Sequence, residues 1–583
     1  MTKGDILTLK LTDLNNLGCG VGHAPDGRAV FVNGAVAGDT VKVSIIKVNK
    51  SFAVGKVIEV TEKSPDREDG YCSAPASCGG CVYRYLNYEK ELLLKRGFVE
   101  YAFRKAGLPD VKIEDVRTTG KTKGYRNKAE YPITNGKNGL YGGFYAQKTH
   151  RVVAADCCSL QPEVFGEILR FFCDFYTKEG VSAYDEETGT GLIRHLYLRE
   201  GVGTGEIMVC PVINGKSLPE EAKFIKELTE SFPRVSSVMI NENTRRTNVV
   251  LGERYRTLYG EPYIEDIFCG KRFRIAPASF YQVNHDAAEL LYGLAAERTG
   301  LSGEGLLLDL YCGAGTIGLS MSERAGEVIG IEIVEAAVEC AKGNKTLNSV
   351  RNASFYCGDA ADAEGLLAPV ERERGKLSPD VVILDPPRKG CDARLLRFLA
   401  EREVPRIVYV SCGPDSLARD CAILKDLGYE IGTVTPVDLF PRTGHVETVV
   451  CLSRQINVHK MKLNSTPFEM IKSGEKNIEL RLYDEKRQRI KVGDKIVFTD
   501  NTTGETLNAI VVKLHRFDSF EELYKSLPLL KCGYTTENVD NAKSSDMEQY
   551  YSVEEQNKYG VVGIELCRPK ENTDESVVCL KRR

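Results

Sequence analysis

Residues 306–318 read LLLDLYCGAGTIG, and this stretch decides the fold of the middle of the chain. An apolar run of strand length leads into glycines at 313, 315 and 318, the G-x-G-x-x-G spacing that follows a strand and opens a helix. Glycines at these positions permit a tight turn and close approach of the backbone to a nucleotide. The stretch therefore predicts an α/β domain with a nucleotide loop at the carboxyl edge of its sheet.

Further apolar runs follow this loop: EVIGIEIV at 327–334, VVIL at 381–384 and RIVYV at 406–410. Each is a run of the kind that parallel sheets bury on both faces, and helical segments separate them. We therefore expect a doubly wound, Rossmann-like domain over residues 281–455.

The rest of the chain divides by pattern into four segments. Residues 1–61 contain short strands separated by glycines, which is typical of a small OB-like β-barrel. Residues 62–95 form a cysteine loop and linker, and residues 96–280 mix tyrosine-rich strands with helices. A last unit, residues 460–583, contains a strand-like run near the terminus.

Composition limits the class of protein. With 583 residues the chain needs several cores, and its 42% apolar and 27% charged residues are ordinary for a globular protein. We find no apolar run of about 20 residues that could span a membrane and no apolar core of a signal peptide at the start, so we expect a cytoplasmic protein. The odd number of cysteines, 19, favours reduced thiols. The net charge of −4 neither supports nor excludes a nucleic-acid partner, and nothing indicates an obligate protein partner.

The glycine loop alone fits a nicotinamide dehydrogenase as well as a methyltransferase, because Glu332 at the end of the next strand can accept ribose hydroxyls in either. Three features favour S-adenosylmethionine. Asp309, just before the glycines, can face a cationic methionine group, and Asp359, after the third strand, can meet the adenine amino group. Residues 385–388 (DPPR) form a rigid turn at the edge where ligands of such folds bind.

A thiol and a base follow in the sequence. Uracil C5 becomes nucleophilic when a thiolate adds to C6, and a base must then remove the C5 proton. Cys412 follows the strand at 406–410, and Glu447 precedes the last strand; His445 is a weaker candidate for the base. The alternative for Cys412 is an ordinary small buried residue. Arg388 and Arg442 are candidates for phosphate contacts.

Seven motifs in order carry a resemblance: YRNK at 125–128, GLIRHL at 191–196, FRIAPASFYQVN at 273–284, DLYCGAGT at 309–316, DPPRKG at 385–390, SCGP at 411–414 and GHVE at 444–447. Over residues 1 to about 455 the chain resembles the RNA (uracil-5-)-methyltransferase family, closest to its branch acting on ribosomal RNA. Residues 1–61, with GCGVG at 18–22, resemble the TRAM domain, an RNA-binding module.

The resemblance implies a class I methyltransferase domain that methylates C5 of a uridine in 23S rRNA, with a tRNA uridine as the alternative. It implies Cys412 as nucleophile and Glu447 as base. It also implies S-adenosylmethionine binding by Gln282, Tyr311, Thr316, Glu332, Asp359 and Asp385. The first two of these come from the resemblance alone. Gly413 departs from the asparagine that many relatives have after the nucleophile.

A cysteine cluster precedes the central region. Cys72, Cys78 and Cys81 follow a C-x5-C-x2-C spacing, and further thiols stand at 157 and 158. Four thiolates suit a 4Fe-4S cluster, a zinc site is the second possibility, and ordinary reduced cysteines are the third. The resemblance implies the iron–sulfur cluster, and its C-x-L-Q pattern selects Cys158 rather than Cys157 as the fourth ligand.

The C-terminal unit resembles the ASCH domain, a β-barrel related to the PUA fold, over about the last 120 residues. That resemblance implies accessory RNA binding. Lys476, Glu479 and Arg481 are spaced so that they can line a pocket, or equally stand on a solvated strand edge.

The expected partner is structured RNA whose target base leaves the stack to enter the site. Tyr125, Arg126, Arg194 and His195 are candidates for RNA contacts. Two other functions compete: a non-catalytic RNA-binding protein, and an amino-group methylase that uses the Asp-Pro-Pro turn. Neither gives Cys412 a role.

Overall fold

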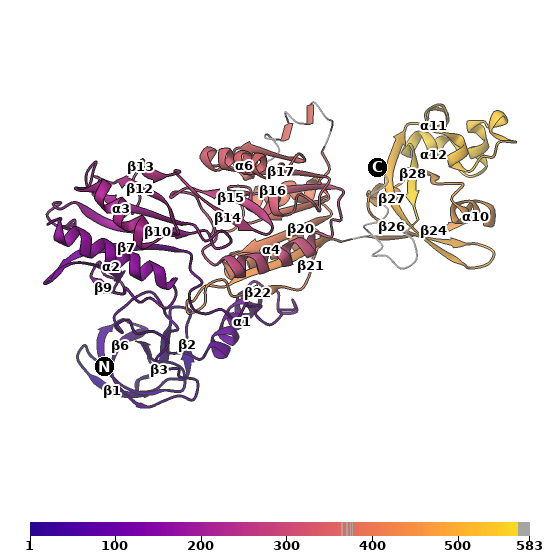
Figure 1. Cartoon of the computed structure of the whole chain (residues 1–583). Coiled ribbons are helices and arrows are strands. Elements are labelled where there is room, and N and C mark those ends of the chain that lie inside the picture. The colour runs from indigo at the N-terminus through magenta and orange to yellow at the C-terminus, as the bar shows by residue number, and fades with distance from the viewer. Residues whose placement is uncertain are drawn as a thin grey trace. The chain divides into compact units, whose positions relative to one another are not determined.

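The computed structural model describes residues 1–568, apart from 363, 364, 366, 369, 370, 373, 374, 376 and 456. Two compact units make up the chain, Met1–Ser453 and Arg454–Arg583 (Figure 1). Residues 569–583 of the predicted C-terminal domain lie outside the described residues. Among the described helices, none combines the length and apolar character needed to cross a membrane.

The Rossmann-like sheet is present as predicted. Its strands are β16 (Leu306–Leu310), β17 (Glu327–Glu332), β18 (Ala353–Cys357), β19 (Val381–Leu384), β20 (Arg406–Ser411), β21 (Tyr429–Ile431), β22 (Thr435–Val437) and β23 (Glu447–Arg454). They lie in the order β18-β17-β16-β19-β20-β23-β21, with β22 paired to β23. The first five are parallel, and β23 runs antiparallel to β20. The order reverses between β16 and β19, so a crevice for ligands is expected at their carboxyl ends.

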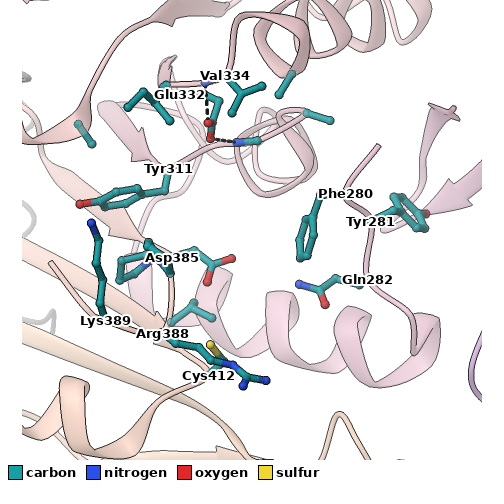
Figure 2. Close-up of a pocket in the computed structure, with 18 of the residues that line it drawn as sticks. Phe280, Tyr281, Gln282, Tyr311, Glu332, Val334, Asp385, Arg388, Lys389 and Cys412 are labelled. Atoms are coloured by element: carbon teal, nitrogen blue, oxygen red, sulfur yellow. Dashed lines mark hydrogen bonds between the residues drawn. The ribbon is translucent and has the colours of Figure 1, made fainter. Parts of the chain in front are cut away.

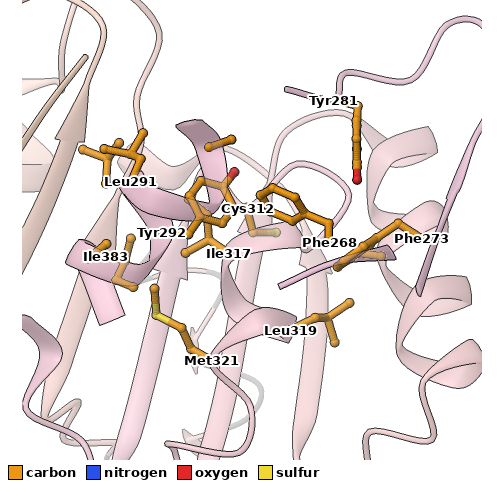
Figure 3. Close-up of a cluster of buried hydrophobic side chains, with 14 of the residues drawn as sticks. Phe268, Phe273, Tyr281, Leu291, Tyr292, Cys312, Ile317, Leu319, Met321 and Ile383 are labelled. Atoms are coloured by element: carbon orange, nitrogen blue, oxygen red, sulfur yellow. The ribbon is translucent and has the colours of Figure 1, made fainter. Parts of the chain in front are cut away.

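Helices cover both faces of this sheet. They are α1 (Tyr88–Lys105), α4 (His285–Thr299), α5 (Thr316–Ser320), α6 (Glu335–Leu347), α8 (Ala393–Glu401) and α9 (Pro414–Asp426). Leu307 and Ile383 point into a core with α4, α5 and α6, while the adjacent Leu308 and Leu384 point into a second core with α1, α8 and α9. Figure 3 shows part of the first core. Burial on both faces explains the continuous apolar runs in the sequence.

The central region is mixed α+β, as expected. Its sheet has the order β13-β12-β11-β10-β7-β8-β9. The strands are β7 (Lys128–Gly136), β8 (Gly139–Tyr145), β9 (Val152–Ala154), β10 (Ile193–Glu200), β11 (Ile207–Ile213), β12 (Val235–Glu242) and β13 (Arg254–Gly260). Helices α2 (Glu163–Lys178) and α3 (Glu221–Ser231) bury aromatic residues with this sheet. A hairpin of β14 (Ile264–Phe268) and β15 (Lys271–Ile275) follows and packs onto the Rossmann-like domain.

The N-terminal part is barrel-like, with strands in the order β1-β5-β6-β4-β3-β2. They are β1 (Ile6–Lys10), β2 (Asp13–Leu14), β3 (Cys19–His23), β4 (Ala29–Asn33), β5 (Thr40–Val48) and β6 (Phe52–Glu62). Residues alternate between buried and more exposed positions along β5, and the inward valines and leucines form a separate core. This alternation is the pattern of strands that bury one face, and the short strands separated by glycines are those from which the barrel was predicted.

The C-terminal unit is a half-barrel with the strand order β24-β26-β27-β28-β25. The strands are β24 (Val458–Leu463), β25 (Ile478–Leu482), β26 (Lys495–Asp500), β27 (Thr506–Phe517) and β28 (Val561–Cys567). Helices α10 (Ser465–Ser473), α11 (Phe520–Ser526) and α12 (Val553–Tyr559) accompany them. Two apolar clusters lie within the unit, so it has a core of its own.

Candidate active site

A cavity of about 1550 Å³ lies at the carboxyl edge of the Rossmann-like sheet, where the strand order reverses (Figure 2). It brings together every predicted catalytic and cofactor-binding residue except Asp309 and Thr316: Gln282, Tyr311, Glu332, Asp359, Asp385, Cys412 and Glu447. These residues come from six strand ends and from the segment before α4. A site assembled from separate strand ends at this edge is the arrangement that doubly wound folds use for ligands.

One wall of the cavity is suited to a nucleoside. The Glu332 carboxylate accepts hydrogen bonds from the backbone N–H groups of Gly313 (3.1 Å) and Val334 (2.9 Å), as Figure 2 shows. These bonds fix the carboxylate at the end of β17. Ile333 and Val334 expose 63% and 53% of their surface and offer an apolar face beside it. Asp359 is exposed nearby and accepts from the N–H of Ala361.

The backbone of Tyr311 is in the left-handed region, with φ of +66°. A non-glycine residue rarely adopts this conformation, and such strain concentrates at functional sites. The conformation turns the chain sharply between β16 and the glycine loop. The ring is half-buried and lies at the cavity, opposite Phe280 in Figure 2.

The structure corrects the expectation for Asp309. This carboxylate is fully buried, accepts a hydrogen bond from Gly318 N–H (2.8 Å), and is absent from the cavity lining. Burial raises its pKa to about 7. Thr316, the first residue of α5, also lies outside the lining, with its hydroxyl 3.3 Å from that of Tyr292. Both residues support the glycine loop from outside the cavity.

The thiol and the carboxyl group emerge from paired strands. Ser411 lies opposite Thr448 in the β20–β23 pair, and the Thr448 hydroxyl donates to the Ser411 carbonyl (3.0 Å). Cys412 follows Ser411, and Glu447 precedes Thr448, so the antiparallel register places them at the same edge. Both line the cavity.

Burial raises the pKa of ionisable side chains at this edge. It raises the pKa of Glu447 to about 8, with a further contribution from Asp385, and it raises the pKa of Asp385 to about 7. Burial, followed by these two carboxyl groups, also raises the pKa of the Cys412 thiol, while Arg388 opposes that shift. A cation in the cavity would favour the ionised carboxylates, because an opposite charge at short range lowers a carboxyl pKa.

The alternative base, His445, is exposed at the rim of the same cavity. Its Nε2 lies 3.5 Å from the Arg388 guanidinium. Partial burial lowers the pKa of His445, and so do the nearby cations Arg388, Lys95 and Arg126. Arg388 itself is exposed in the lining, as a phosphate contact requires.

Three lining residues were not anticipated as a group. Phe280 exposes 76% of its surface and faces the cavity beside Gln282 in Figure 2. Lys128 lines the cavity too, together with the predicted RNA contact Arg126. Ligand cavities are lined mainly by apolar and aromatic side chains, so the exposed ring offers surface to a bound molecule. The motif at 273–284 contains Phe280, but nothing in the sequence distinguishes it from a core aromatic residue.

Four candidates for RNA contacts are buried instead: Tyr125 (2% exposed), Arg194 (5%), His195 (8%) and Arg442 (2%). The Tyr125 hydroxyl donates to the carbonyl of Pro441 (2.9 Å). Burial lowers the pKa of His195 to about 4. These side chains hold the protein together and do not reach RNA, so the sequence prediction was wrong for them.

The cysteine loop brings Cys72, Cys81 and Cys158 into one cluster with Tyr71 and Tyr125. Burial raises the pKa of the Cys81 thiol, and the neighbouring thiols at 158, 72 and 78 raise it further. Cys157 is exposed and contacts Ser73. Among the residues that the structure describes, no group of three or more His, Cys, Asp or Glu side chains is arranged to hold a metal ion, so the predicted metal centre is not confirmed.

In the C-terminal unit the three predicted pocket residues form ion pairs. Glu479 is 2% exposed and pairs with Lys476 Nζ (2.8 Å) and Arg481 Nη1 (2.8 Å). The Arg481 side chain is 18% exposed. Burial lowers the pKa of Arg481, but Glu479 and Tyr551 raise it by more, so the pKa lies above its usual value. A solvated strand edge is therefore excluded for Lys476 and Glu479.

Comparison with known proteins agrees with this arrangement. Residues 87–455 match the family model described as tRNA (Uracil-5-)-methyltransferase, residues 1–58 match the TRAM domain, and residues 461–570 match the ASCH domain. An uncharacterised RNA methyltransferase of Clostridium acetobutylicum is 38% identical over 455 residues, covering 78% of this chain and 98% of the relative. One from Oceanobacillus iheyensis is 39% identical, covering 78% and 98%.

A solved structure has the same architecture. The tRNA (uracil-54, C5)-methyltransferase of Pyrococcus abyssi, in complex with S-adenosyl-L-homocysteine, superposes with a TM-score of 0.62. Its sequence is 28% identical, and the match covers 76% of this chain and all of that one.

Proposed function

Since the chain belongs to the tRNA (uracil-5-)-methyltransferase family and is an RNA methyltransferase, we propose that it methylates C5 of a uridine through a covalent adduct on Cys412. One observation supports this most: the β20–β23 register sets Cys412 beside Glu447 in a cavity that also holds Glu332 and Asp385. An amino-group methylase or a dehydrogenase has no use for a thiol and a buried carboxyl group at that edge.

In the proposed reaction the Cys412 thiolate adds to C6 of the base, and electron density moves to C5. S-adenosylmethionine would supply the electrophilic methyl group: as C5 bonds to this carbon, the S–CH3 bond breaks and its electron pair stays on sulfur, which leaves S-adenosylhomocysteine. The Glu447 carboxylate then accepts the proton from C5. The electron pair of that C–H bond restores the C5–C6 double bond, the C6–S bond breaks, and Cys412 leaves as a thiolate.

We assign the cofactor to the wall around the glycine loop. In this proposal Glu332 accepts the ribose hydroxyls, Asp359 accepts from the adenine amino group, and Asp385 faces the charged methionine end. Gln282, Tyr311 and Thr316 complete the proposed set. The fit is supported by the fixed Glu332 carboxylate and by the apolar face of Ile333 and Val334.

We propose 23S rRNA as the substrate, with a tRNA uridine as the second candidate. The second has specific support, because the Pyrococcus abyssi structure is that of a tRNA (uracil-54, C5)-methyltransferase. Mapping 5-methyluridine in ribosomal and transfer RNA from a deletion strain decides between them. Loss of the modification from tRNA alone would overturn the ribosomal proposal. A cytoplasmic location accords with either substrate.

We propose that Cys72, Cys78, Cys81 and Cys158 hold a 4Fe-4S cluster. In such a cluster each thiolate binds a different iron, so the sulfurs need not surround one ion. Support comes from the closeness of the four thiols, since Cys158, Cys72 and Cys78 all raise the pKa of Cys81. Three of them also pack against Tyr71 and Tyr125. Iron and sulfide analysis of an anaerobic preparation tests this, and a colourless protein with equimolar zinc overturns it.

For the domains we propose the boundaries 1–61, 62–95, 96–280, 281–455 and 460–583, the last with an accessory RNA-binding role. The second compact unit, beginning at Arg454, has its own core, which makes deletion feasible. Unchanged RNA affinity and unchanged choice of uridine after deletion would remove that role.

The decisive experiment on the reaction is trapping with RNA that contains 5-fluorouridine. Fluorine at C5 cannot leave as a proton, so the wild-type protein with S-adenosylmethionine should stall as a covalent complex that survives denaturation. Cys412→Ala should give none. A wild-type protein that methylates ordinary RNA but forms no such complex would overturn the proposed mechanism.

A further inference from the structure

The segment between β22 and β23 leads directly into the proposed base, Glu447, the first residue of β23, and the backbone of this segment is held from several directions. Four consecutive carbonyl groups each accept a hydrogen bond from a different part of the chain. The acceptors and donors are Leu439 with Asn284, Phe440 with Lys95, Pro441 with Tyr125, and Arg442 with the N–H of Tyr83. This segment, residues 438–446, is called the catalytic loop below. Four residues separate Arg442 from Glu447.

Arg442 is the centre of this arrangement. It is 2% exposed and has a backbone φ of +69°, a conformation that non-glycine residues seldom adopt. Its own N–H donates to Glu91 Oε1 (2.7 Å), and its guanidinium donates to the Leu86 carbonyl and to Glu68 (2.9 Å). Such a residue persists in a strained conformation only when its surroundings fix it.

Buried charges complete the network. Lys95 is fully buried between Glu91 (2.7 Å) and Asp438 (2.7 Å), and Asp438 also accepts from the Tyr88 hydroxyl. Removal of one member of a buried ion-pair network leaves an uncompensated charge. The catalytic loop therefore has one favoured arrangement, set by both of its ends.

The same arginine contacts the cysteine cluster. Its guanidinium lies 4.1 Å from the centre of the Tyr71 ring, and Tyr71 directly precedes Cys72. Tyr71 and Tyr125 belong to one apolar cluster with three of the cysteines, and Tyr125 bonds the loop at Pro441. Two neighbouring side chains thus connect the cysteine cluster to the catalytic loop.

We propose that Arg442 is a positioning residue that fixes Glu447 for removal of the C5 proton and joins the catalytic loop to the cysteine cluster. The inference rests on the proposed role of Glu447. It predicts a specific defect. Adduct formation needs Cys412 on β20, which Arg442 does not touch, whereas adduct breakdown needs Glu447, which follows the loop that Arg442 holds.

The test uses the full-length protein, unmodified 23S rRNA transcribed in vitro, and S-adenosylmethionine. Arg442→Gln should slow methylated-RNA release by about ten-fold to a hundred-fold, as small misplacements of catalytic groups do. The covalent fraction at steady state should rise, while the KM for S-adenosylmethionine should stay within about two-fold of wild type. Arg442→Lys, which keeps the charge but loses the fork of donors, should fall between the two.

Arg194→Gln is the matched control. Arg194 is also buried, and its guanidinium donates to the carbonyls of Asn243, Arg245 and Thr247, away from the catalytic loop. This variant should lower the melting temperature without raising the covalent fraction. If Arg442→Gln fails to fold, Glu68→Gln replaces it, because Glu68 is the half-exposed end of the network.

The outcomes separate the two claims. If Glu447→Gln accumulates adduct and neither Arg442→Gln nor Glu68→Gln does, the positioning role is overturned and the proposed base stands. If wild-type protein methylates RNA with no covalent complex under any trapping condition, the proposed function and this inference both fall.

Discussion

Ser411 and Thr448 lie directly opposite each other in the β20–β23 pair. Cys412 and Glu447 are the next residues from this pair toward the edge of the sheet. The strands are antiparallel, so both residues leave the sheet at the same edge. Strand pairing thus places the proposed nucleophile and the proposed base at one edge, each directly next to or within its strand.

Cys412→Ala and Glu447→Gln should fail at different steps. We expect Cys412→Ala to reduce methylation by about a thousand-fold or more and to form no covalent complex. Glu447→Gln should form the adduct and accumulate it, because proton removal is blocked. Denaturing gels of labelled RNA measure both, and S-adenosylmethionine affinity is the control that should stay unchanged for Cys412→Ala. Normal adduct release by Glu447→Gln would refute its role as base.

The ligand-free protein should become more stable when Glu447 is replaced by Gln. A raised pKa means that the fold favours the neutral carboxyl: the contribution is complete below the unfolded value of about 4 and is lost as the pH rises through about 8. Gln stays neutral, so its advantage should grow with pH, to about 2–4 °C in melting temperature at pH 8.5. An advantage that shrinks with rising pH would contradict the burial argument.

Affinity for S-adenosylmethionine should increase with pH. Asp385 has a pKa of about 7 and Glu447 about 8, and the cationic cofactor favours both in their ionised forms. Between pH 6 and pH 8 each carboxyl group can contribute up to about ten-fold. Calorimetric titration measures this, with S-adenosylhomocysteine, which lacks the sulfonium charge, as the control. Equal pH dependence of the two ligands would exclude a charge effect.

Phe280→Ala should weaken RNA binding, because an exposed ring in the cavity offers a stacking surface for the target base. Stacking of one base is worth about 1–3 kcal/mol, so the KM for RNA should rise roughly five-fold to a hundred-fold. Phe280→Leu keeps apolar volume without a ring and should lose most of the same affinity. Unchanged KM in both variants would assign Phe280 another role.

The sheet, its glycine loop and its edge residues could be predicted from the sequence because they depend on the pattern of residues close together in the chain. Apolar runs predict parallel strands, and residues directly after such strands must gather at the carboxyl edge. The proposed site residues Cys412, Asp385 and Glu332 follow from that rule alone. The lining shows that all three meet in one cavity.

The same reasoning failed for buried polar residues. Arg442, Arg194 and Tyr125 were candidates for RNA contacts, yet each donates to backbone carbonyls inside the protein, and Arg442 also donates to Glu68. For Arg442 the acceptor at Leu86 is 356 positions away. No local sequence pattern shows which carbonyl groups lack a hydrogen-bond partner in a strand or helix of the fold. These carbonyl groups need donors, and that need determines which arginine and tyrosine side chains are buried.

The catalytic loop is also in close contact with the first domain. A side chain at Gly444 would collide with the carbonyl oxygen of Asn16, in the turn between β2 and β3, and Tyr83 bonds to the neighbouring Asn15. The barrel therefore packs against the catalytic loop from outside the cavity, and a shortened enzyme that begins after the barrel should be inactive. Natural or engineered exchange of this barrel would have to preserve the 15–18 turn.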